Sequence, residues 1–367
     1  MTRSLADTLE QHVAEGTAPG ILVVSGSAGE PLTFSSAGDL AHDAIFRIQS
    51  MTKPVLAVAT LRLVQDGRIA LDDPADRWLP ELADREVLRT PESPLTDTEP
   101  ANRSITVRDL LTNQSGYGMM TTASPLKQAM IENRTEASQE PVSLGAQDWL
   151  NALAELPLAF QPGTGWRYHQ SFGILGILLS RIVGEPVGEH LRTDLFEPLG
   201  MRDTGYTVPQ AQAHRLPAAY RHDEKGSLIE IEPAAGGFYV APAPFALDHA
   251  ELVSTASDYA AFARMLASGG RHDGRVLLDP ALLEQLTRDQ VSAAVKSDDS
   301  FFPGFWNGTG WGYGVAVVTS GPHTGRYGWS GGLGTDVSVD PDGSFRVILT
   351  QVEMDARVMA LFGEVQA

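Results

Sequence analysis

The serine and lysine of Ser50-Met51-Thr52-Lys53 have the types and spacing needed for covalent catalysis. Three residues apart on a helix, they lie on one face, so the lysine amine can reach the serine hydroxyl. Burial disfavours the charged form of a lysine, and a neutral amine can accept the serine proton. The helix N-terminus adds N–H groups and partial positive charge where an oxyanion would form. The motif alone also fits a simpler role, with Ser50 as a helix N-cap and Lys53 on the surface.

A second S-x-x-K run, Ser124-Pro125-Leu126-Lys127, provides an internal comparison. Proline is favoured at the first helical position, and residues 128–134 are mostly polar, so we expect Ser124 to be only an N-cap and Lys127 to stay solvated. Residues 53–65, in contrast, carry apolar side chains around most of the helix circumference. This pattern predicts a buried helix, which favours chemistry at Ser50.

Tyr168 is a second candidate for proton transfer. It lies in the run Trp166-Arg167-Tyr168-His169-Gln170, between a turn rich in proline and glycine and an apolar helix expected at 172–183. A tyrosine held against a helix start can relay a proton if neighbouring cations favour its phenolate. A ring that packs at a domain seam explains this residue equally well. We expect His169 to be a structural or rim residue.

The glycine-rich run from Gly328 to Thr335 contains G-x-S-x-G around Ser330. In a nucleophile elbow this pattern needs a following helix, and an acid and then a histidine later in the chain. No histidine follows His323, and a strand pattern comes next, so the elbow interpretation fails. We predict an edge strand whose backbone N–H groups face the nucleophile, with Gly331 and Gly332 permitting close approach of a ligand. Ser330 then makes at most a polar contact.

The composition excludes several classes of function. Acidic residues outnumber basic ones 46 to 27, a formal net charge of −19, so we expect neither nucleic acid nor a membrane as a partner. The absence of cysteine excludes a cysteine nucleophile, disulfides and thiolate metal sites. Nine histidines without H-x-x-x-H or H-E-x-x-H pairs, and glycine-rich loops without a P-loop lysine, predict no metal ion or other cofactor.

The first sixteen residues do not resemble a targeting segment. Ser4 and Asp7 form a possible capping box, and apolar residues recur at helical spacing up to Gly16. No basic region leads into an apolar stretch, and no apolar run approaches 18 residues. We therefore predict a cytoplasmic protein, although a chain that had lost a leader would look the same.

Strand patterns occur at both ends of the sequence, and helical patterns fill the middle. The expected strands are 20–27, 31–35, 45–48, 312–319, 335–340 and 344–351. The expected helices, besides 53–65 and 172–183, are 107–111, 147–155, 188–196, 257–266, 280–286 and 354–364. Residues 90–102 are expected to form an exposed loop.

This order predicts an α+β fold with an antiparallel sheet flanked by helices and built from both chain ends. Residues 1–67 and 245–367 would form the sheet domain, and residues 68–244 a mainly helical domain inserted between them.

Together these motifs resemble the serine β-lactamase and penicillin-binding-protein-like superfamily, which includes class C β-lactamases, D-Ala-D-Ala carboxypeptidases, D-aminopeptidases and family VIII carboxylesterases. Three further runs match in family order: Leu110–Gly116, similar to the family's L-L-x-H-T-S-G, then Phe196–Thr204 and Leu252–Asp258. The resemblance covers almost the whole chain. It implies a β-lactamase/transpeptidase-like fold.

The resemblance also implies roles for individual residues. Ser50 would be the acylated nucleophile and Lys53 its general base. Tyr168 matches the tyrosine of the family's Y-x-N element, which moves the proton to the leaving group and activates the deacylating water. Trp329-Ser330-Gly331-Gly332 matches the third element, which is K-T-G or H-x-G-G in peptidases and lactamases and W-x-G in many esterases. The backbone N–H groups of Ser50 and Gly332 would form the oxyanion hole.

Two departures from the family pattern bear on the substrate. Gln170 stands where Y-x-N has asparagine, which puts its contact to an amide substrate in question. Trp329 replaces the lysine or histidine that binds the carboxylate of a β-lactam or a peptidyl-D-Ala. The run His323-Thr324-Gly325 spells H-T-G, but it lies in an expected turn between strands and is not the third element.

We therefore expect a serine hydrolase that acts through an acyl-enzyme, a carboxylesterase on short-chain or small-molecule esters. A β-lactamase, a D-amino-acid peptidase or amide hydrolase, or an acyltransferase would use the same residues. A third alternative is an inactive protein that binds a peptidoglycan or acyl metabolite. Residues 85–145 and 205–250 are expected to shape the pocket, and the sequence predicts no oligomeric state.

Overall fold

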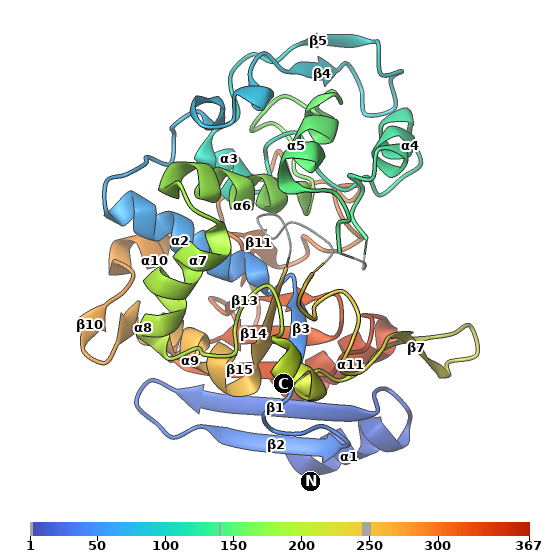
Figure 1. Cartoon of the computed structure of the whole chain (residues 1–367), viewed down its shortest axis with the longest axis vertical. Coiled ribbons are helices and arrows are strands. Elements are labelled where there is room, and N and C mark those ends of the chain that lie inside the picture. The colour runs from blue at the N-terminus through green and yellow to red at the C-terminus, as the bar shows by residue number, and fades with distance from the viewer. Residues whose placement is uncertain (1–2, 139–140, 244–250) are drawn as a thin grey trace.

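A sheet of seven antiparallel strands forms the lower part of the molecule in Figure 1. The computed structural model describes residues 3–138, 141–243 and 251–367. The strand order is β11-β12-β13-β14-β15-β1-β2. Their bounds are Gly20–Ser27 (β1), Thr33–Gly38 (β2), Thr309–Trp311 (β11), Ala316–Val318 (β12), Tyr327–Gly331 (β13), Thr335–Val339 (β14) and Ser344–Leu349 (β15). The two ends of the chain meet where β1 pairs with β15, which confirms the predicted sheet built from both ends.

Helices cover both faces of this sheet. Helices α1 (Leu5–Ala14) and α11 (Ala356–Gln366) pack on one face, and α9 (Ala256–Ala267) packs on the other. Along β1, Ile21 and Val23 face the first layer while Leu22 and Val24 face the second. Side chains alternate between the faces of a strand, so a continuous apolar run fits a strand that is covered on both sides.

The upper part of Figure 1 is mainly helical. It contains α3 (Val107–Leu111), α4 (Pro125–Glu132), α5 (Ala146–Ala154) and α6 (Gln170–Val183), together with strands β4 (Glu86–Leu88) and β5 (Thr98–Pro100). The prediction of a loop over 90–102 is wrong at its end, because residues 98–100 pair with β4. A three-residue strand is too short to show the alternation by which strands are recognised.

Two buried helices join the upper and lower parts. Helix α2 (Thr52–Gln65) is buried along almost its whole length, and the apolar helix α6 packs against it. Within the described residues, no single helix is long and apolar enough to cross a membrane. Helix α6 and Val187–Leu199 meet that criterion only as a pair bent by 78°.

Residues 187–243 and 251–255 lie at the side of the sheet, below the upper part. They form α7 (Val187–Leu191), a π-helical turn (Arg192–Phe196), α8 (Glu197–Leu199), β6 (Ala219–His222), β7 (Leu228–Glu232) and β8 (Leu252–Thr255). Strand β8 pairs with β3 (Ile45–Gln49), and Tyr220 bridges to Val352. The division into two domains stays a prediction, and its boundary at 244/245 lies outside the described residues. The remaining elements in the described residues are α10 (Pro280–Leu286), β9 (Arg271–His272), β10 (Arg275–Val276) and the 3-10 turns Ala75–Arg77, Pro80–Leu82 and Gln210–Arg215.

The predicted strand 312–319 begins too early, because residues 312–315 form a turn and only Ala316–Val318 (β12) is a strand, whereas β11 lies before the predicted range. Strands β11 and β12 are joined by a turn in which Gly314 has a left-handed φ of 70°. A side chain there would approach the Lys53 carbonyl oxygen to 2.8 Å, so glycine lets this turn lie directly against α2.

The prediction of an edge strand at 328–335 is wrong, because β11 and β12 continue the sheet beyond β13. However, β12 pairs with β13 only at Tyr327 and Gly328. The partnered side of β13 therefore ends just before Trp329.

Arg47 anchors the strand that leads to Ser50. Its side chain is fully buried, pairs with Glu232 at 2.9 Å and donates to the Pro217 carbonyl at 2.7 Å. The Gln351 amide bonds to both backbone groups of Arg47, at 3.0 and 3.1 Å. Arg47 thus ties β3 to β7 and to the segment after β15.

Removal of this buried cation should strongly destabilise the fold. In Arg47→Met the Glu232 carboxylate loses its partner, and we expect the free energy of unfolding to fall by about 3–5 kcal/mol. Urea unfolding followed by circular dichroism measures this change. The double variant R47M/E232Q should recover part of the loss, because no unpaired charge remains. Arg192→Met, at a surface ion pair, should leave the midpoint nearly unchanged. Equal effects of R47M and R192M would contradict the anchoring role.

Candidate active site

Ser50 lies in a tight junction between β3 and α2. The pairing of β3 with β8 is irregular between Arg47 and Gln49, and Gln49 has a left-handed φ of 50°. Met51 is the N-cap residue of α2, and no side chain caps the helix. The Ser50 hydroxyl is therefore not used as a cap. Such backbone strain in a residue other than glycine is typical of functional sites.

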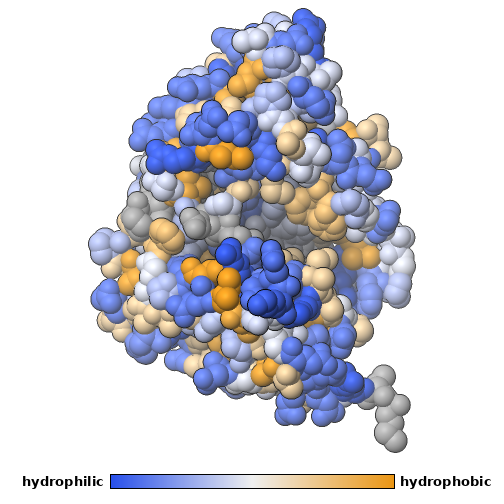
Figure 2. All heavy atoms as spheres, turned by 90° about the vertical axis from the view of Figure 1, so that its right-hand side faces the viewer, coloured by the Kyte–Doolittle hydropathy of each residue, from blue (hydrophilic) through white to orange (hydrophobic). Residues whose placement is uncertain are grey.

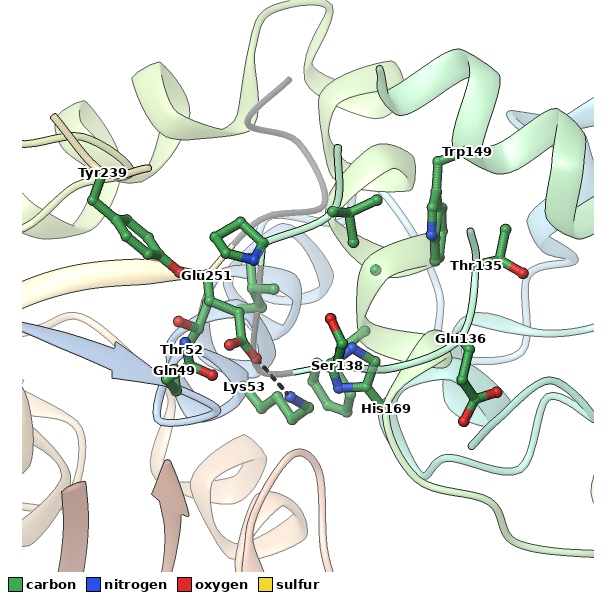
Figure 3. Close-up of a pocket in the computed structure, with 15 residues that line it drawn as sticks. Gln49, Thr52, Lys53, Thr135, Glu136, Ser138, Trp149, His169, Tyr239 and Glu251 are labelled. Carbon is green, nitrogen blue, oxygen red and sulfur yellow. Dashed lines mark hydrogen bonds and ion pairs between the residues drawn. The ribbon is translucent and has the colours of Figure 1, made fainter. Parts of the chain in front are cut away.

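The side chains of Ser50, Lys53 and Glu251 meet at this junction. Lys53 Nζ donates to Ser50 Oγ at 2.8 Å and to Glu251 Oε1 at 3.3 Å. Ser50 Oγ also donates to Glu251 Oε1, at 3.3 Å. Figure 3 shows Glu251 and Lys53 pointing toward each other. The three polar atoms thus form a closed triangle in which the Lys53 side chain is only 3% exposed.

The charge of Lys53 is set by three opposing effects. Burial alone would lower its pKa, but the neighbouring Tyr168 and the Glu251 carboxylate raise it, and the pKa ends above its usual value. Lys53 therefore carries its proton at neutral pH in the resting protein. An ammonium donates hydrogen bonds but accepts none, so Lys53 cannot take the Ser50 proton in this state.

Tyr168 lies on the other side of Lys53. Its ring centroid is 4.8 Å from Lys53 Nζ, and its hydroxyl accepts a hydrogen bond from Trp329 Nε1 at 2.5 Å. Burial raises the pKa of Tyr168, against the charge of Lys53 and hydrogen bonds with Ser50 and Trp329 that favour the phenolate. The resting residue is thus a phenol, whereas the sequence argument had required a phenolate.

The glycine-rich run lies directly beside the backbone that precedes Ser50. A side chain at Gly331 would approach the Ile48 carbonyl oxygen to 2.3 Å, so only glycine fits there. Thr335 Oγ1 donates to the same carbonyl at 3.1 Å. Gly332 follows β13, and its carbonyl accepts the Met354 N–H at 2.9 Å. The structure therefore brings residues 329–332 next to the Ser50 junction.

Ser330 points away from this junction. Its hydroxyl donates to Asp336 Oδ1 at 2.6 Å, and the Gln366 amide of α11 donates to the other carboxylate oxygen. Trp329 and Ser330 are neighbours on a strand, so their side chains occupy opposite faces of the sheet. Ser330 therefore makes a polar contact to Asp336 on the α11 face, within the limit that the sequence set, and its place in the predicted substrate-binding set stays a prediction.

At the start of α6, Gln170 holds a loop, and His169 agrees with the predicted structural or rim role. Gln170 is fully buried and donates to the Thr135 carbonyl at 3.1 Å, so its amide holds a loop. His169 has a left-handed φ of 94° and lines the cavity beside Lys53. Burial and the positive charge of Lys53 lower the pKa of His169 to about 4. At neutral pH it is therefore an uncharged part of the cavity wall.

A cavity of about 670 Å³, part of it open to solvent, lies above Lys53. Figure 2 shows this face hollowed between the upper and lower parts of the molecule. Residues that line the cavity are Gln49, Thr52, Lys53, Leu56, Thr135, Glu136, Ser138, Pro141, Val142, Trp149, His169, Phe172, Gly173, Tyr239 and Glu251.

The cavity lining combines aromatic rings with two carboxyl groups. Trp149 and Phe172 lie on the α5 and α6 side, and Tyr239 lies near Glu251. Burial raises the pKa of Glu136 to about 7, although the charge of Lys127 opposes this. Across residues 3–138, 141–243 and 251–367, no group of three or more histidine or acidic side chains could hold a metal ion.

Aromatic side chains pack against the Tyr168 ring. The Phe301 ring centroid lies 4.9 Å from that of Tyr168, and the Trp329 centroid lies 5.3 Å away. Trp166 contacts Phe305 and Trp311 in the same cluster. The cluster fixes the orientation of the Tyr168 ring.

Comparisons with known proteins agree with this arrangement. A family model described as Beta-lactamase matches residues 5–356. The chain belongs to this family. Protein Rv1367c of Mycobacterium tuberculosis is 36% identical over 82% of this chain and 75% of its own length. Esterase EstB of Burkholderia gladioli is 29% identical over the same shares, 82% and 75%.

The fold is shared with solved structures of the same superfamily. The structure of EstCE1, described as a hydrolase with promiscuous acyltransferase activity, has a TM-score of 0.78 at 23% identity and covers 98% of this chain and 97% of its own. The β-lactamase-like fold expected from the motifs is confirmed, and the protein is a member of the serine hydrolase superfamily.

Sequence reasoning missed Glu251 in this β-lactamase family protein. Strand pairing of Gln49 with Leu252 places residue 251 beside Ser50, although the two are about 200 residues apart in the chain. The available signal was its position immediately before the matched run Leu252–Asp258. The prediction for the second S-x-x-K run is confirmed, because the Ser124 side chain caps α4 by accepting the Lys127 N–H.

The buried Asp336 predicts an unusual pH dependence of stability. Burial raises the pKa of Asp336 to about 7, although Ser330, Arg326 and Gln366 oppose this. The folded state therefore holds the Asp336 proton more tightly than the unfolded chain does. The contribution of this group to the free energy of unfolding is present below about pH 4 and falls as the pH rises to about 7. We expect Asp336→Asn, which never ionises, to melt at a higher temperature than wild type at pH 8. The gain should shrink toward pH 5.

Thermal melts of both proteins at the two pH values measure this difference. Asp340→Asn is the matched control, because Asp340 pairs with Arg326 and its removal should bring no gain at pH 8. A D336N gain that is equal at both pH values would contradict the assignment.

Proposed function

We propose that this protein is a serine carboxylesterase that forms an acyl-enzyme on Ser50 and acts on short-chain or other small-molecule esters. The observation that carries the proposal is the 2.8 Å contact of Ser50 Oγ with Lys53 Nζ in a buried junction beside Tyr168. The relationship to an esterase, EstB, supports the same reaction class.

The proposed reaction has two halves. Ser50 Oγ bonds to the carbonyl carbon of the ester, the C–O bond to the alcohol breaks, and the alcohol leaves with one proton. Water then attacks the acyl carbon, which releases the acid and restores Ser50. Lys53 carries a proton in both halves, and Tyr168 passes a proton to the leaving alcohol. The backbone N–H groups of Ser50 and Gly332 hold the oxyanion.

The charges around the cavity favour esters over substrates that carry a carboxylate. Trp329 is uncharged at the position where lactamases and carboxypeptidases have a cation. Lys53 is already paired with Glu251, and Glu136 is a second carboxyl group of the lining. The Glu251 carboxylate repels a substrate carboxylate, and Glu136, whose pKa burial raises to about 7, repels it only in its ionised form. Gln170 is also committed to Thr135 and does not offer its amide to a substrate.

Acyl transfer to an alcohol is the second candidate. It uses the same acyl-enzyme with an alcohol in place of water, and EstCE1 is described as having both activities. The ratio of transesterification to hydrolysis, measured with butanol and p-nitrophenyl butyrate, separates the two. A nitrocefin kcat/KM above that for simple esters would instead assign a β-lactamase. The cytoplasmic location and the absence of nucleic-acid and membrane partners stay predictions from the sequence.

Replacement of Ser50 tests the proposal directly. Ser50→Ala should lower kcat/KM for p-nitrophenyl acetate and butyrate by at least about 1,000-fold, because no nucleophile remains. Wild type, but not S50A, should gain a mass adduct on residue 50 after treatment with a fluorophosphonate. Ser124→Ala, in the second S-x-x-K run, is the matched control and should keep full activity. Near-normal turnover by S50A would remove the nucleophile assignment, and an unlabelled, inactive wild type would favour the binding-protein alternative.

Removal of the indole donor to Tyr168 should slow proton transfer. In Trp329→Phe the pKa of Tyr168 rises further, because a hydrogen bond that favours the phenolate is lost. We expect kcat on p-nitrophenyl butyrate to fall roughly tenfold with little change in KM. Trp306→Phe is the control, because it removes an indole donor to Ser300 in the same cluster. Equal losses in W329F and W306F would point to packing alone.

A further inference from the structure

We propose that Glu251 is a further catalytic residue, whose carboxylate accepts the Ser50 proton when the acyl-enzyme forms. This role rests on the proposed function of Ser50 as the nucleophile. It assigns the first proton transfer to a residue outside the Ser50, Lys53 and Tyr168 set.

The hydrogen bonds around Ser50 fix the direction of its proton. The Lys53 ammonium can donate hydrogen bonds but cannot accept them, so Nζ donates to Ser50 Oγ. The Ser50 hydroxyl must therefore donate its own proton to another group. One acceptor is Glu251 Oε1, 3.3 Å away, and the other is the Tyr168 oxygen, which belongs to a phenol and not to an anion. Glu251 Oε1 is also 3.3 Å from Lys53 Nζ. Such contacts are often long in unliganded enzymes and shorten when substrate binds.

Backbone contacts hold Glu251 in place. Gln49 pairs with Leu252 across β3 and β8, and the Leu252 N–H donates to Thr52 Oγ1 at 2.8 Å. Residue 251 is therefore fixed beside the first turn of α2. Its side chain is 19% exposed, so the carboxylate is mostly shielded from water while it faces the cavity.

The other titratable groups that face Glu251 are poor acceptors. Burial keeps Tyr168 a phenol, and its oxygen already accepts from Trp329. Burial and Lys53 lower the pKa of His169 to about 4, which makes it a weak base. Burial and the charge of Glu251 raise the pKa of Tyr239, so it also keeps its proton. With Lys53 protonated, the carboxylate is the base that contacts Ser50 Oγ.

The protons balance in each half of the reaction. In acylation, the Ser50 proton moves to Glu251 Oε1 as the Oγ–acyl bond forms, and the leaving alcohol takes the Tyr168 hydroxyl proton, which the Lys53 ammonium replaces. Glu251 then returns its proton to the neutral Lys53 amine. In deacylation, water gives its proton to Glu251 while its oxygen attacks the acyl carbon. Ser50 Oγ leaves with a proton from Lys53, and the pair resets.

The test is Glu251→Gln, which keeps the shape and hydrogen bonds but removes the base. We expect kcat/KM for p-nitrophenyl butyrate at pH 7 to fall at least about 100-fold, the scale of general-base catalysis. In E251Q the remaining base is the Lys53 amine, which must first lose a proton, so the rising limb of the kcat/KM profile moves to higher pH.

Three further measurements separate the alternatives. Glu230→Gln, which removes an equal charge on the exposed strand β7, should keep the wild-type rate and pH profile. Glu251→Asp retains a carboxylate, so its kcat/KM should depend on pH in the acid range as that of wild type does. This variant also tests the proposal if E251Q does not fold. Fluorophosphonate labelling of Ser50 in wild type tests the nucleophile by itself.

The outcomes are distinguishable. A wild type that is labelled at Ser50, with E251Q within threefold of its rate or faster, overturns the role of Glu251 and leaves the esterase proposal intact. A slower E251Q with an unshifted pH profile assigns Glu251 to positioning only and overturns the base role. A wild type that neither turns over esters nor labels at Ser50 overturns both proposals.

Discussion

Closely placed opposite charges at the start of α2 are the feature on which the site depends. An ammonium and a carboxylate that are largely removed from water stabilise each other only if the backbone holds them in register. Four contacts do so at the β3–α2 junction: Arg47 with Glu232, Thr335 with the Ile48 carbonyl, Tyr259 Oη with the Met51 carbonyl, and the Leu252 N–H with Thr52. The sheet and α9 are therefore both needed to position one hydroxyl group.

This arrangement explains why the lysine spacing alone says little about mechanism. A lysine one turn from a serine is a base only where its charge is not favoured, and here Glu251 favours the charge. The same carboxylate accepts the serine proton and opposes an anionic substrate. Trp329 acts in the same sense, because it orients Tyr168 through its N–H and places no cation in the site. Proton transfer and substrate charge are thus coupled through a few neighbouring groups.

The sequence predicted what local spacing determines. The capping box of Ser4, the buried helix after Ser50 and strand β1 all follow from patterns within a few residues. It failed where the answer depended on distant pairing. The glycine-rich strand was expected at the edge of the sheet, but β11 and β12 lie beyond it. The side of the sheet that Ser330 faces was not predicted, and neither was the contact of Glu251 with Ser50. No local pattern records that β3 and β8 are neighbours, and that pairing builds the proton acceptor.

The pairing of β1 with β15 has a consequence for biosynthesis. The partners Leu22 and Leu349 are about 300 residues apart, so at ribosomal speeds of about 5–20 residues per second β1 waits roughly 15–60 seconds for its neighbour. During that time one edge of the first hairpin is open to aggregation, and folding must close a long loop. Ser50 is made early, but Glu251 and Trp329 arrive late. A nascent chain therefore carries its nucleophile without the groups that surround it.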